Sequence, residues 1–110
     1  MSGQSAQVSV VVPVLNEQDN IKPLYNQLTQ ALSNKYKYEL VFIDDGSTDA
    51  SFGILSELHK ADDKVKVIRF RKNFGQTAAL SAGFANSQGQ IVIAIDADLQ
   101  NDPAEIPRMI

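Results

Sequence analysis

The sequence contains no cysteine, which excludes disulfide bonds and thiolate metal sites and permits a reducing compartment. No apolar run approaches the roughly 18 residues needed to span a bilayer. The chain has ten basic and thirteen acidic residues, a net charge of −3. From this mildly acidic balance we expect no nucleic-acid partner and no polybasic segment for anionic lipid.

Several common functional motifs are also missing. There is no G-x-G-x-x-G dinucleotide fingerprint, no G-x-x-x-x-G-K-[ST] phosphate loop, no G-x-S-x-G nucleophile elbow and no H-E-x-x-H zinc motif. The only histidine, His59, falls on a polar helix end, and we interpret it as a surface residue without a catalytic role. The 110 residues contain no repeat or linker and predict one domain.

Apolar, β-branched segments alternate with helical patterns along the chain. The predicted strands are residues 8–13 (VSVVVP), 39–44 (ELVFID), 65–70 (VKVIRF) and 91–96 (IVIAID). Three are nearly continuous apolar runs, typical of parallel strands covered on both faces, whereas the third alternates and is expected nearer an edge. Helical spacing predicts helices around 21–32, 52–58 and 76–86, and Pro103 suits the first turn of a fourth. This order predicts an α/β fold with a parallel sheet.

Polar motifs follow all four predicted strands: residues 13–17 (PVLNE), 44–49 (DDGSTD), 71–76 (RKNFGQ) and 96–103 (DADLQNDP). Ligands of open parallel sheets bind at the carboxyl ends of the strands. We therefore expect these motifs to converge on one rim that forms the functional site.

Asp96, Asp98 and Gln100 form a D-x-D-x-Q pattern directly after the fourth strand. Alternate residues of an extended segment point the same way, and three oxygen ligands suit Mg²⁺ or Mn²⁺. An isolated D-x-D is more often a solvated turn before a helix. Its position after a buried strand in a βα series favours the metal site.

The second motif contains three carboxylates. Because Asp-Gly is turn chemistry, we assign the turn to Asp45, with Ser47 or Thr48 capping the second helix. Asp44 ends its strand and is expected to face the cleft, where it would accept a hydrogen bond from a uracil or guanine N–H. Asp49 is interpreted as a structural acid in the first helical turn.

Two further positions have two interpretations each. Glu17 is either an acid of the first helix's early turn or a contact to a nucleoside, and spacing alone does not choose between them. Gly75 opens the third helix, where free amides could meet a phosphate, although a simple cap is favoured.

Taken together, the runs VSVVVPVLNEQDNI, VFIDDGSTD, RKNFGQTAALSAGF and IDADLQNDPAEIP resemble successive signatures of family 2 glycosyltransferases. Within that family they are most similar to the dolichol- and polyprenyl-phosphate sugar synthases. The resemblance covers nearly the whole chain after Gln7, and four ordered motifs are far more specific than one. It implies the A-type glycosyltransferase fold, which is Rossmann-like, and an inverting transfer.

The resemblance also implies functional residues. Asp96 and Asp98 match the catalytic D-x-D pair at a metal-bound diphosphate, and Gln100 matches an additional metal ligand. The residues that we expect to bind the nucleotide sugar are Pro13, Leu15, Glu17, Asp44, Gly75, Gln76, Asp96, Ala97 and Asp98.

The implied reaction is hexosyl transfer from a UDP- or GDP-sugar to an acceptor, expected to be a polyprenyl phosphate, with Mg²⁺ or Mn²⁺ neutralising the leaving group. Catalytic domains of this kind are considerably longer than the chain. We therefore expect residues 1–110 to be the N-terminal donor-binding part, inactive alone and prone to form a homo-oligomer. The full-length protein is expected at the cytoplasmic face of a membrane, with its lipid acceptor bound by the missing half.

Two other interpretations are open. In phosphohydrolases of the haloacid-dehalogenase type, a D-x-D supplies an aspartate nucleophile and a Mg²⁺ ligand. That motif ends the first strand and continues with Thr or Val, whereas here it follows the fourth strand and continues with Leu99 and Gln100. The other alternative is a non-catalytic nucleotide-binding or interaction module.

Overall fold

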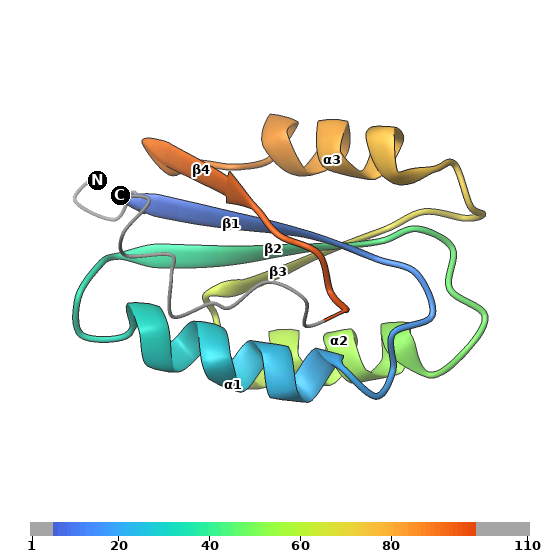
Figure 1. Ribbon diagram of the computed structural model, residues 1–110, viewed down its shortest axis with the longest axis horizontal. Coiled ribbons are helices and arrows are strands. Elements are labelled where there is room, and N and C mark those ends of the chain that lie inside the picture. The colour runs from blue at the N-terminus through green and yellow to red at the C-terminus, as the bar shows by residue number, and fades with distance from the viewer. Residues whose placement is uncertain (1–5, 99–110) are drawn as a thin grey trace.

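The computed structural model describes residues 6–98, so Gln100 and the helix predicted near Pro103 lie outside the described residues. The described part alternates strands and helices as predicted (Figure 1). Its elements are β1 (Val8–Val14), α1 (Ile21–Leu32), β2 (Tyr38–Asp44), α2 (Ser51–Ala61), β3 (Val65–Arg69), α3 (Gln76–Ala85) and β4 (Ile91–Ala94).

The four strands form one parallel sheet with the order β3-β2-β1-β4. β1 lies inside the sheet, where it pairs with β2 from Val8↔Tyr38 to Val14↔Asp44 and with β4 from Val8↔Ile91 onward. β3 lies at one edge, which confirms the position expected for the alternating strand. Within the described residues β4 lies at the other edge and is largely exposed, so the cover on both faces that its apolar run predicted is wrong. β2 and β3 are added on one side of β1 and β4 on the other, so the direction of strand addition changes at β1. Open α/β sheets bind ligands at such a switch point.

Helices cover both faces of the sheet, α1 and α2 on one face and α3 on the other (Figure 1). The stripe predicted for α1 is buried against the α1–α2 face, together with Phe42 and Leu55. The core under α3 is smaller and is formed, among the described residues, by Val11, Val41, Ile43 and Ala79. No helix within residues 6–98 combines the length and apolarity that crossing a membrane would require.

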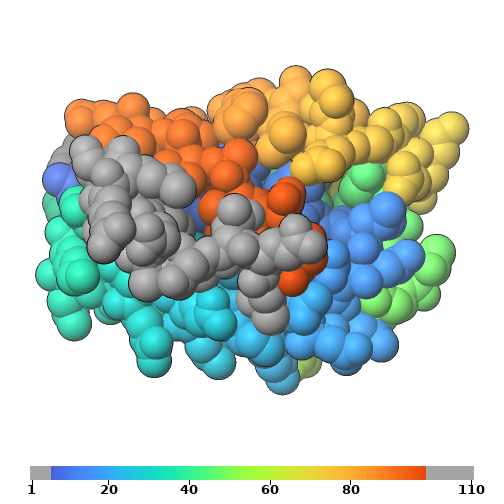
Figure 2. Space-filling model, in the orientation of Figure 1, coloured from blue at the N-terminus to red at the C-terminus, as the bar shows by residue number. Residues whose placement is uncertain are grey.

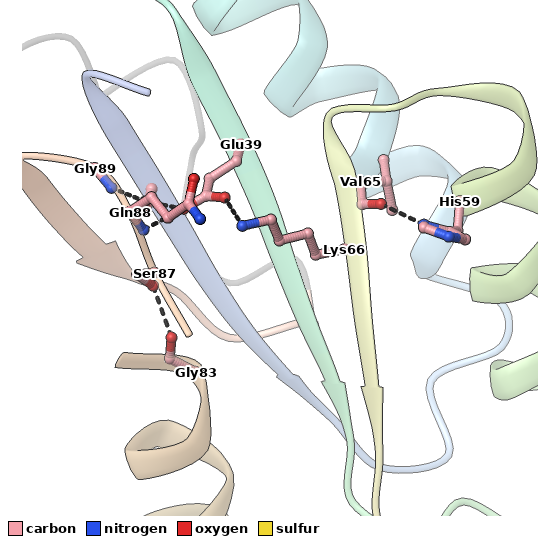
Figure 3. Close-up of polar contacts among 9 residues, drawn as sticks. Glu39, His59, Val65, Lys66, Gly83, Ser87, Gln88 and Gly89 are labelled. Atoms are coloured by element: carbon pink, nitrogen blue, oxygen red, sulfur yellow. Dashed lines mark hydrogen bonds and ion pairs between the residues drawn. The ribbon is translucent and has the colours of Figure 1, made fainter. Parts of the chain in front are cut away.

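A polar network ties the strands together at their amino ends (Figure 3). Glu39 Oε1 lies 2.6 Å from Lys66 Nζ, and Glu39 Oε2 accepts hydrogen bonds from Ser9 Oγ at 2.5 Å and from the Gln88 amide at 2.6 Å. The Gly89 amide donates to Ser9 Oγ at 2.8 Å. Burial raises the pKa of Glu39, but the hydrogen bonds from Lys66, Ser9 and Gln88 outweigh it and leave the pKa below its ordinary value. The network joins β1, β2, β3 and the α3–β4 connection.

Candidate functional site

A cavity of about 470 Å³ lies at the carboxyl ends of the strands. Residues following β1, β2, β3 and β4 all contribute to its wall, so the four polar motifs converge as predicted. The segment after β4 lies beside the end of β1 on the surface (Figure 2). The lining residues are Pro13, Val14, Leu15, Glu17, Asp45, Asn73, Gly75, Gln76, Asp96, Ala97 and Asp98.

Of the nine residues expected to bind a nucleotide sugar, the cavity brings together all but Asp44. The Asp44 side chain is fully buried; its Oδ1 accepts a hydrogen bond from the Ser47 amide at 2.9 Å, and its Oδ2 has no hydrogen-bond partner among the described residues. Asp44 therefore shapes the turn before α2, and our assignment of that role to Asp45 was wrong. Pleat alternation explains the exchange: Asp44 shares a face with the core residue Phe42, two positions earlier.

Asp45 faces the other way and lines the cavity, which the sequence interpretation missed. Its side chain is only 4% exposed; Oδ1 accepts a hydrogen bond from the Phe74 amide at 2.8 Å and Oδ2 one from the Gly75 amide at 3.1 Å. The β3–α3 loop is thereby fixed at the cavity. Asn73 and Val14 also line the cavity; they were not predicted individually, although both fall within the motifs at 71–76 and 13–17 that were expected to converge there.

Glycines bring this loop close to the β2–α2 turn and open α3. Gly46 has a φ of +77°, and an added Cβ there would lie 2.5 Å from the backbone nitrogen of Asn73. Gly75 is the N-cap of α3 with a φ of +102°, which agrees with the predicted helix start. Because both Gly75 and Gln76 line the cavity, the positive end of the α3 dipole borders it.

Glu17 lies outside α1, which begins four residues later at Ile21. The interpretation of Glu17 as an acid of the first helical turn is therefore wrong. Its Oε1 accepts a hydrogen bond from Asn20 Nδ2 at 2.8 Å, and its amide donates to Ser51 Oγ at 3.0 Å. The carboxylate is half-buried in the cavity wall, where contact with a nucleoside stays a prediction.

The β1–α1 loop and the β2–α2 turn hold each other through Asn16, which has a φ of +53°. The backbone amide of Asn16 donates a hydrogen bond to Ser47 Oγ at 2.9 Å, and its side-chain Oδ1 accepts one from the backbone amide of Thr48 at 2.8 Å. The predicted helix cap at Ser47 or Thr48 is therefore wrong, since α2 begins only at Ser51. Asp49 Oδ1 accepts from the Ser51 amide at 2.9 Å, which agrees with a structural role, but Asp49 precedes α2, so its predicted place in the first helical turn is wrong.

Asp96 and Asp98 line the same cavity, with the buried Ala97 between them. Gln76 Nε2 donates a hydrogen bond to Asp96 Oδ1 at 3.2 Å. Within residues 6–98 no group of three or more His, Cys, Asp or Glu side chains is placed to hold a metal. The two carboxylates supply hard oxygen donors that fit Mg²⁺ or Mn²⁺, while Gln100, the third predicted ligand, lies outside the described residues.

Comparison with known proteins gives a consistent picture. The family model described as Glycosyl transferase family 2 matches residues 9–110. The chain is 38% identical, over 97% of its length, to the dodecaprenyl-phosphate galacturonate synthase of Rhizobium johnstonii. It is 45% identical, over 94% of its length, to the undecaprenyl-phosphate 4-deoxy-4-formamido-L-arabinose transferase of Edwardsiella ictaluri. Each match covers 32% of the relative, so the chain spans about a third of the length of these relatives.

Solved structures match as well. TarS of S. aureus in complex with UDP superposes with a TM-score of 0.74 and 28% identity, covering 84% of this chain and 27% of TarS. The glucosyl-3-phosphoglycerate synthase of Mycobacterium tuberculosis, in complex with Mn²⁺, UDP and glucosyl-3-phosphoglycerate, gives a TM-score of 0.68 and 26% identity over 93% of this chain and 37% of that one.

Proposed function

This chain belongs to glycosyl transferase family 2 and has the A-type fold, and we propose that it binds the donor for transfer of a sugar from a UDP- or GDP-sugar to a polyprenyl phosphate. The observation that carries the proposal is the cavity at the strand ends, where Asp96 and Asp98 meet the N-terminus of α3. The names of the curated relatives support the acceptor class, because both specify a polyprenyl phosphate.

We assign the two ends of the cavity to the two ends of the donor. Pro13, Leu15 and Glu17 form the wall that receives the nucleoside, and the amino end of α3, at Gly75 and Gln76, receives the diphosphate. Backbone amides at a helix N-terminus favour phosphate through both hydrogen bonds and the dipole. This arrangement sets the diphosphate beside the carboxylates that follow β4.

The carboxylates repel a diphosphate unless a cation lies between them. Two unit charges about 4 Å apart at an effective dielectric constant near 20 repel by roughly 4 kcal/mol, and solvent reduces this figure for the exposed Asp96. We propose that Asp98 and Gln100, assisted by Asp96, hold Mg²⁺ or Mn²⁺. When bound, the ion neutralises the developing charge of the diphosphate leaving group.

A phosphate acceptor would simplify the chemistry required of the protein. Its attacking oxygen is already anionic, so a strong general base is unnecessary, and attack opposite the leaving group inverts the anomeric centre. The protein then contributes chiefly positioning and charge stabilisation. We propose that residues 1–110 are the donor-binding part of a longer catalytic domain, because the chain spans about a third of the length of its relatives. We propose further that this domain lies at the cytoplasmic face of a membrane.

Calorimetric titration of the chain with UDP, GDP and their sugar conjugates tests the proposal. We expect saturable binding of one nucleotide series when Mn²⁺ or Mg²⁺ is present and none in excess chelator. A chain that binds neither series with metal present would contradict the assignment. Hydrolysis of a generic phosphate ester would favour a phosphohydrolase instead, and sugar transfer by these 110 residues alone would overturn the division into donor and acceptor parts.

A further inference from the structure

In the part of the chain that the structure describes, β3 pairs only with β2, so its other edge has no neighbouring strand. The Lys64 carbonyl and the Phe70 amide, just before and just after β3, both bond to β2. Backbone groups alternate between the two sides of a strand. The amide and carbonyl groups of Val65, Val67 and Arg69 therefore point away from the sheet.

His59 of α2 closes the amino end of this open edge (Figure 3). Its Nδ1 lies 2.7 Å from the Val65 carbonyl oxygen, and because a carbonyl only accepts, Nδ1 carries the hydrogen. The Val65 amide donates to the Asp62 carbonyl at 3.1 Å. Among the described residues no hydrogen bond reaches the outward groups of Val67 and Arg69, so the unpaired part of the edge begins at Val67.

A cavity of about 490 Å³ lies beside this edge. His59 and Val67 line it at the edge, Lys66 and Ile68 line it from β3, and residues 85–88 line it from the end of α3. It shares no lining residue with the cavity at the carboxyl ends of the strands. When an extended peptide adds to a sheet edge, alternate side chains enter pockets beside that edge, and this cavity is placed to receive one.

The chain along this edge is basic. Residues 64–72 contain no acidic residue and five basic ones, Lys64, Lys66, Arg69, Arg71 and Lys72, whereas Asp62 and Asp63 precede the stretch. Lys66 is paired with Glu39, and the exposed Arg69 lies over the ring of Phe52 at 4.0 Å. Cations on an edge strand oppose pairing with a second copy of the same edge. The same cations attract an acidic strand, with which they form cross-strand ion pairs.

We propose that the open edge of β3 binds an extended acidic segment of a partner protein by strand addition. The segment pairs with the backbone of Val67 and Arg69 and sets carboxylates opposite Lys66 and Arg69. These two cations are three positions apart and therefore lie on opposite faces of the strand. The partner segment accordingly carries two acidic residues separated by two others, a Glu-x-x-Glu pattern. The proposal goes beyond the donor site and does not rest on it.

Titration with a short peptide tests the charge pattern. The probe is the capped peptide Thr-Glu-Val-Thr-Glu-Val-Thr, and its control has glutamine at both glutamate positions. His59 is the only histidine, so its imidazole NMR signals report binding at the edge. We expect saturable shifts with a dissociation constant below about 1 mM for the acidic peptide and about five- to tenfold weaker binding of the control. No saturation by the acidic peptide, or equal affinities for the two, would overturn the proposal.

N-methylated peptides test whether the backbone is used. Alternate amides of an extended peptide point to the same side, so methylating the even-numbered amides of the probe blocks one side and methylating the odd-numbered amides blocks the other. Strand addition predicts that one of these two peptides binds and the other does not. Attraction between charges alone treats them alike, and equal binding of both would refute strand addition.

Changes in the chain give the complementary test. Val67→Pro removes an outward amide and no bond to β2, a substitution that edge strands tolerate, and the control Val67→Ala retains the amide. The proline variant should lose peptide binding and the alanine variant should keep it, with circular dichroism as the check of folding. Arg69→Gln should weaken binding about two- to fivefold, whereas Lys22→Gln, on α1, should leave it unchanged. Equal binding by the proline and alanine variants would contradict the proposal, and the methylated peptides give the same test on the unaltered chain.

A second copy of the chain is the competing occupant of this edge. Sedimentation of the chain alone distinguishes it: a dimer that Val67→Pro dissolves and the acidic peptide does not would assign the edge to self-association and overturn the proposal. Because the two cavities share no lining residue, saturating peptide should leave nucleotide binding unchanged. Failure of strand addition therefore leaves the proposed donor site untouched, and the two proposals fail separately.

Discussion

Replacing Gly46 by alanine should be among the most destabilising single-methyl changes in the chain. Gly46 has a φ of +77°, and an added Cβ would overlap the carbonyl carbon of Lys72 and lie 2.5 Å from the nitrogen of Asn73. Both neighbours are backbone atoms, so no change of side-chain rotamer relieves the overlap. The β3–α3 loop would have to move away from the turn.

The expected cost has two parts. A non-glycine residue in the left-handed region costs about 1–2 kcal/mol, and forcing packed backbone apart costs about 1–3 kcal/mol more. We therefore expect Gly46→Ala to lower the free energy of unfolding by roughly 2–5 kcal/mol. Because the displaced loop carries Asn73 and Gly75 into the cavity wall, nucleotide affinity should fall as well.

Two other glycines separate the contributions. Gly75, with a φ of +102° and a ψ of 160°, has a backbone conformation largely restricted to glycine, but no described atom lies within 4 Å of an added Cβ, so Gly75→Ala should show only the strain, about 1–3 kcal/mol. Gly53 lies within α2 with open space around it, and Gly53→Ala should stabilise by about 0.5–1 kcal/mol. Urea denaturation followed by circular dichroism ranks the three. A Gly46→Ala variant within about 0.5 kcal/mol of the parent would refute the close approach of the two loops.

Three further predictions concern carboxylates and a phenol. Asp98→Asn should abolish metal-dependent nucleotide binding in calorimetry without unfolding the chain, while the control Asp49→Asn should leave binding unchanged; equal affinity with and without chelator would contradict the metal site. Because the pKa of Glu39 is below its ordinary value of 4.5, its contribution to the free energy of unfolding is complete above pH 4.5 and is lost as the pH falls. Glu39→Gln should lower the free energy of unfolding by about 2–3 kcal/mol at pH 7 and flatten the acid side of a plot of stability against pH. An unchanged acid side would argue against the network. The hydrogen bond from Tyr25 to Asp62, 2.6 Å long, raises the pKa of Tyr25 above 10.0, so the stabilisation it gives is present below pH 10 and is lost as the pH rises. Tyr25→Phe should lower the free energy of unfolding by about 1 kcal/mol at neutral pH and reduce the loss of stability at alkaline pH. A series of urea denaturations at high pH would detect this difference.

The elements that could be predicted from sequence are those whose signal is local. The apolar stripe of α1 and the apolar runs of β1 and β2 predict correctly which of their residues are buried. The polar motifs after the strands predict that these segments meet at one edge of the sheet. The errors arise where a partner distant in the sequence decides. Ser47 and Thr48 look like helix caps by themselves, but their partner is Asn16, more than thirty residues away.

The exchange of Asp44 and Asp45 has a different cause. Which of two adjacent carboxylates enters a cleft depends on the phase of the pleat, and the core residue Phe42 sets that phase. Asn73 lies in the cavity wall because Asp45 binds the Phe74 amide and Gly46 packs against the backbone of the same loop, and neither contact is visible in the sequence.

The order of the strands has a consequence for how the chain is made. β1 is synthesised first, yet one of its two neighbours, β4, is the last of the described strands, and Val8 pairs with Ile91, 83 positions later. Closing so long a loop delays the pairing, and non-local strand contacts slow folding in general. Until β4 has left the ribosome, one edge of β1 therefore stays open to other strands. Of the four described strands, the first to be synthesised is therefore completed by pairing with the last.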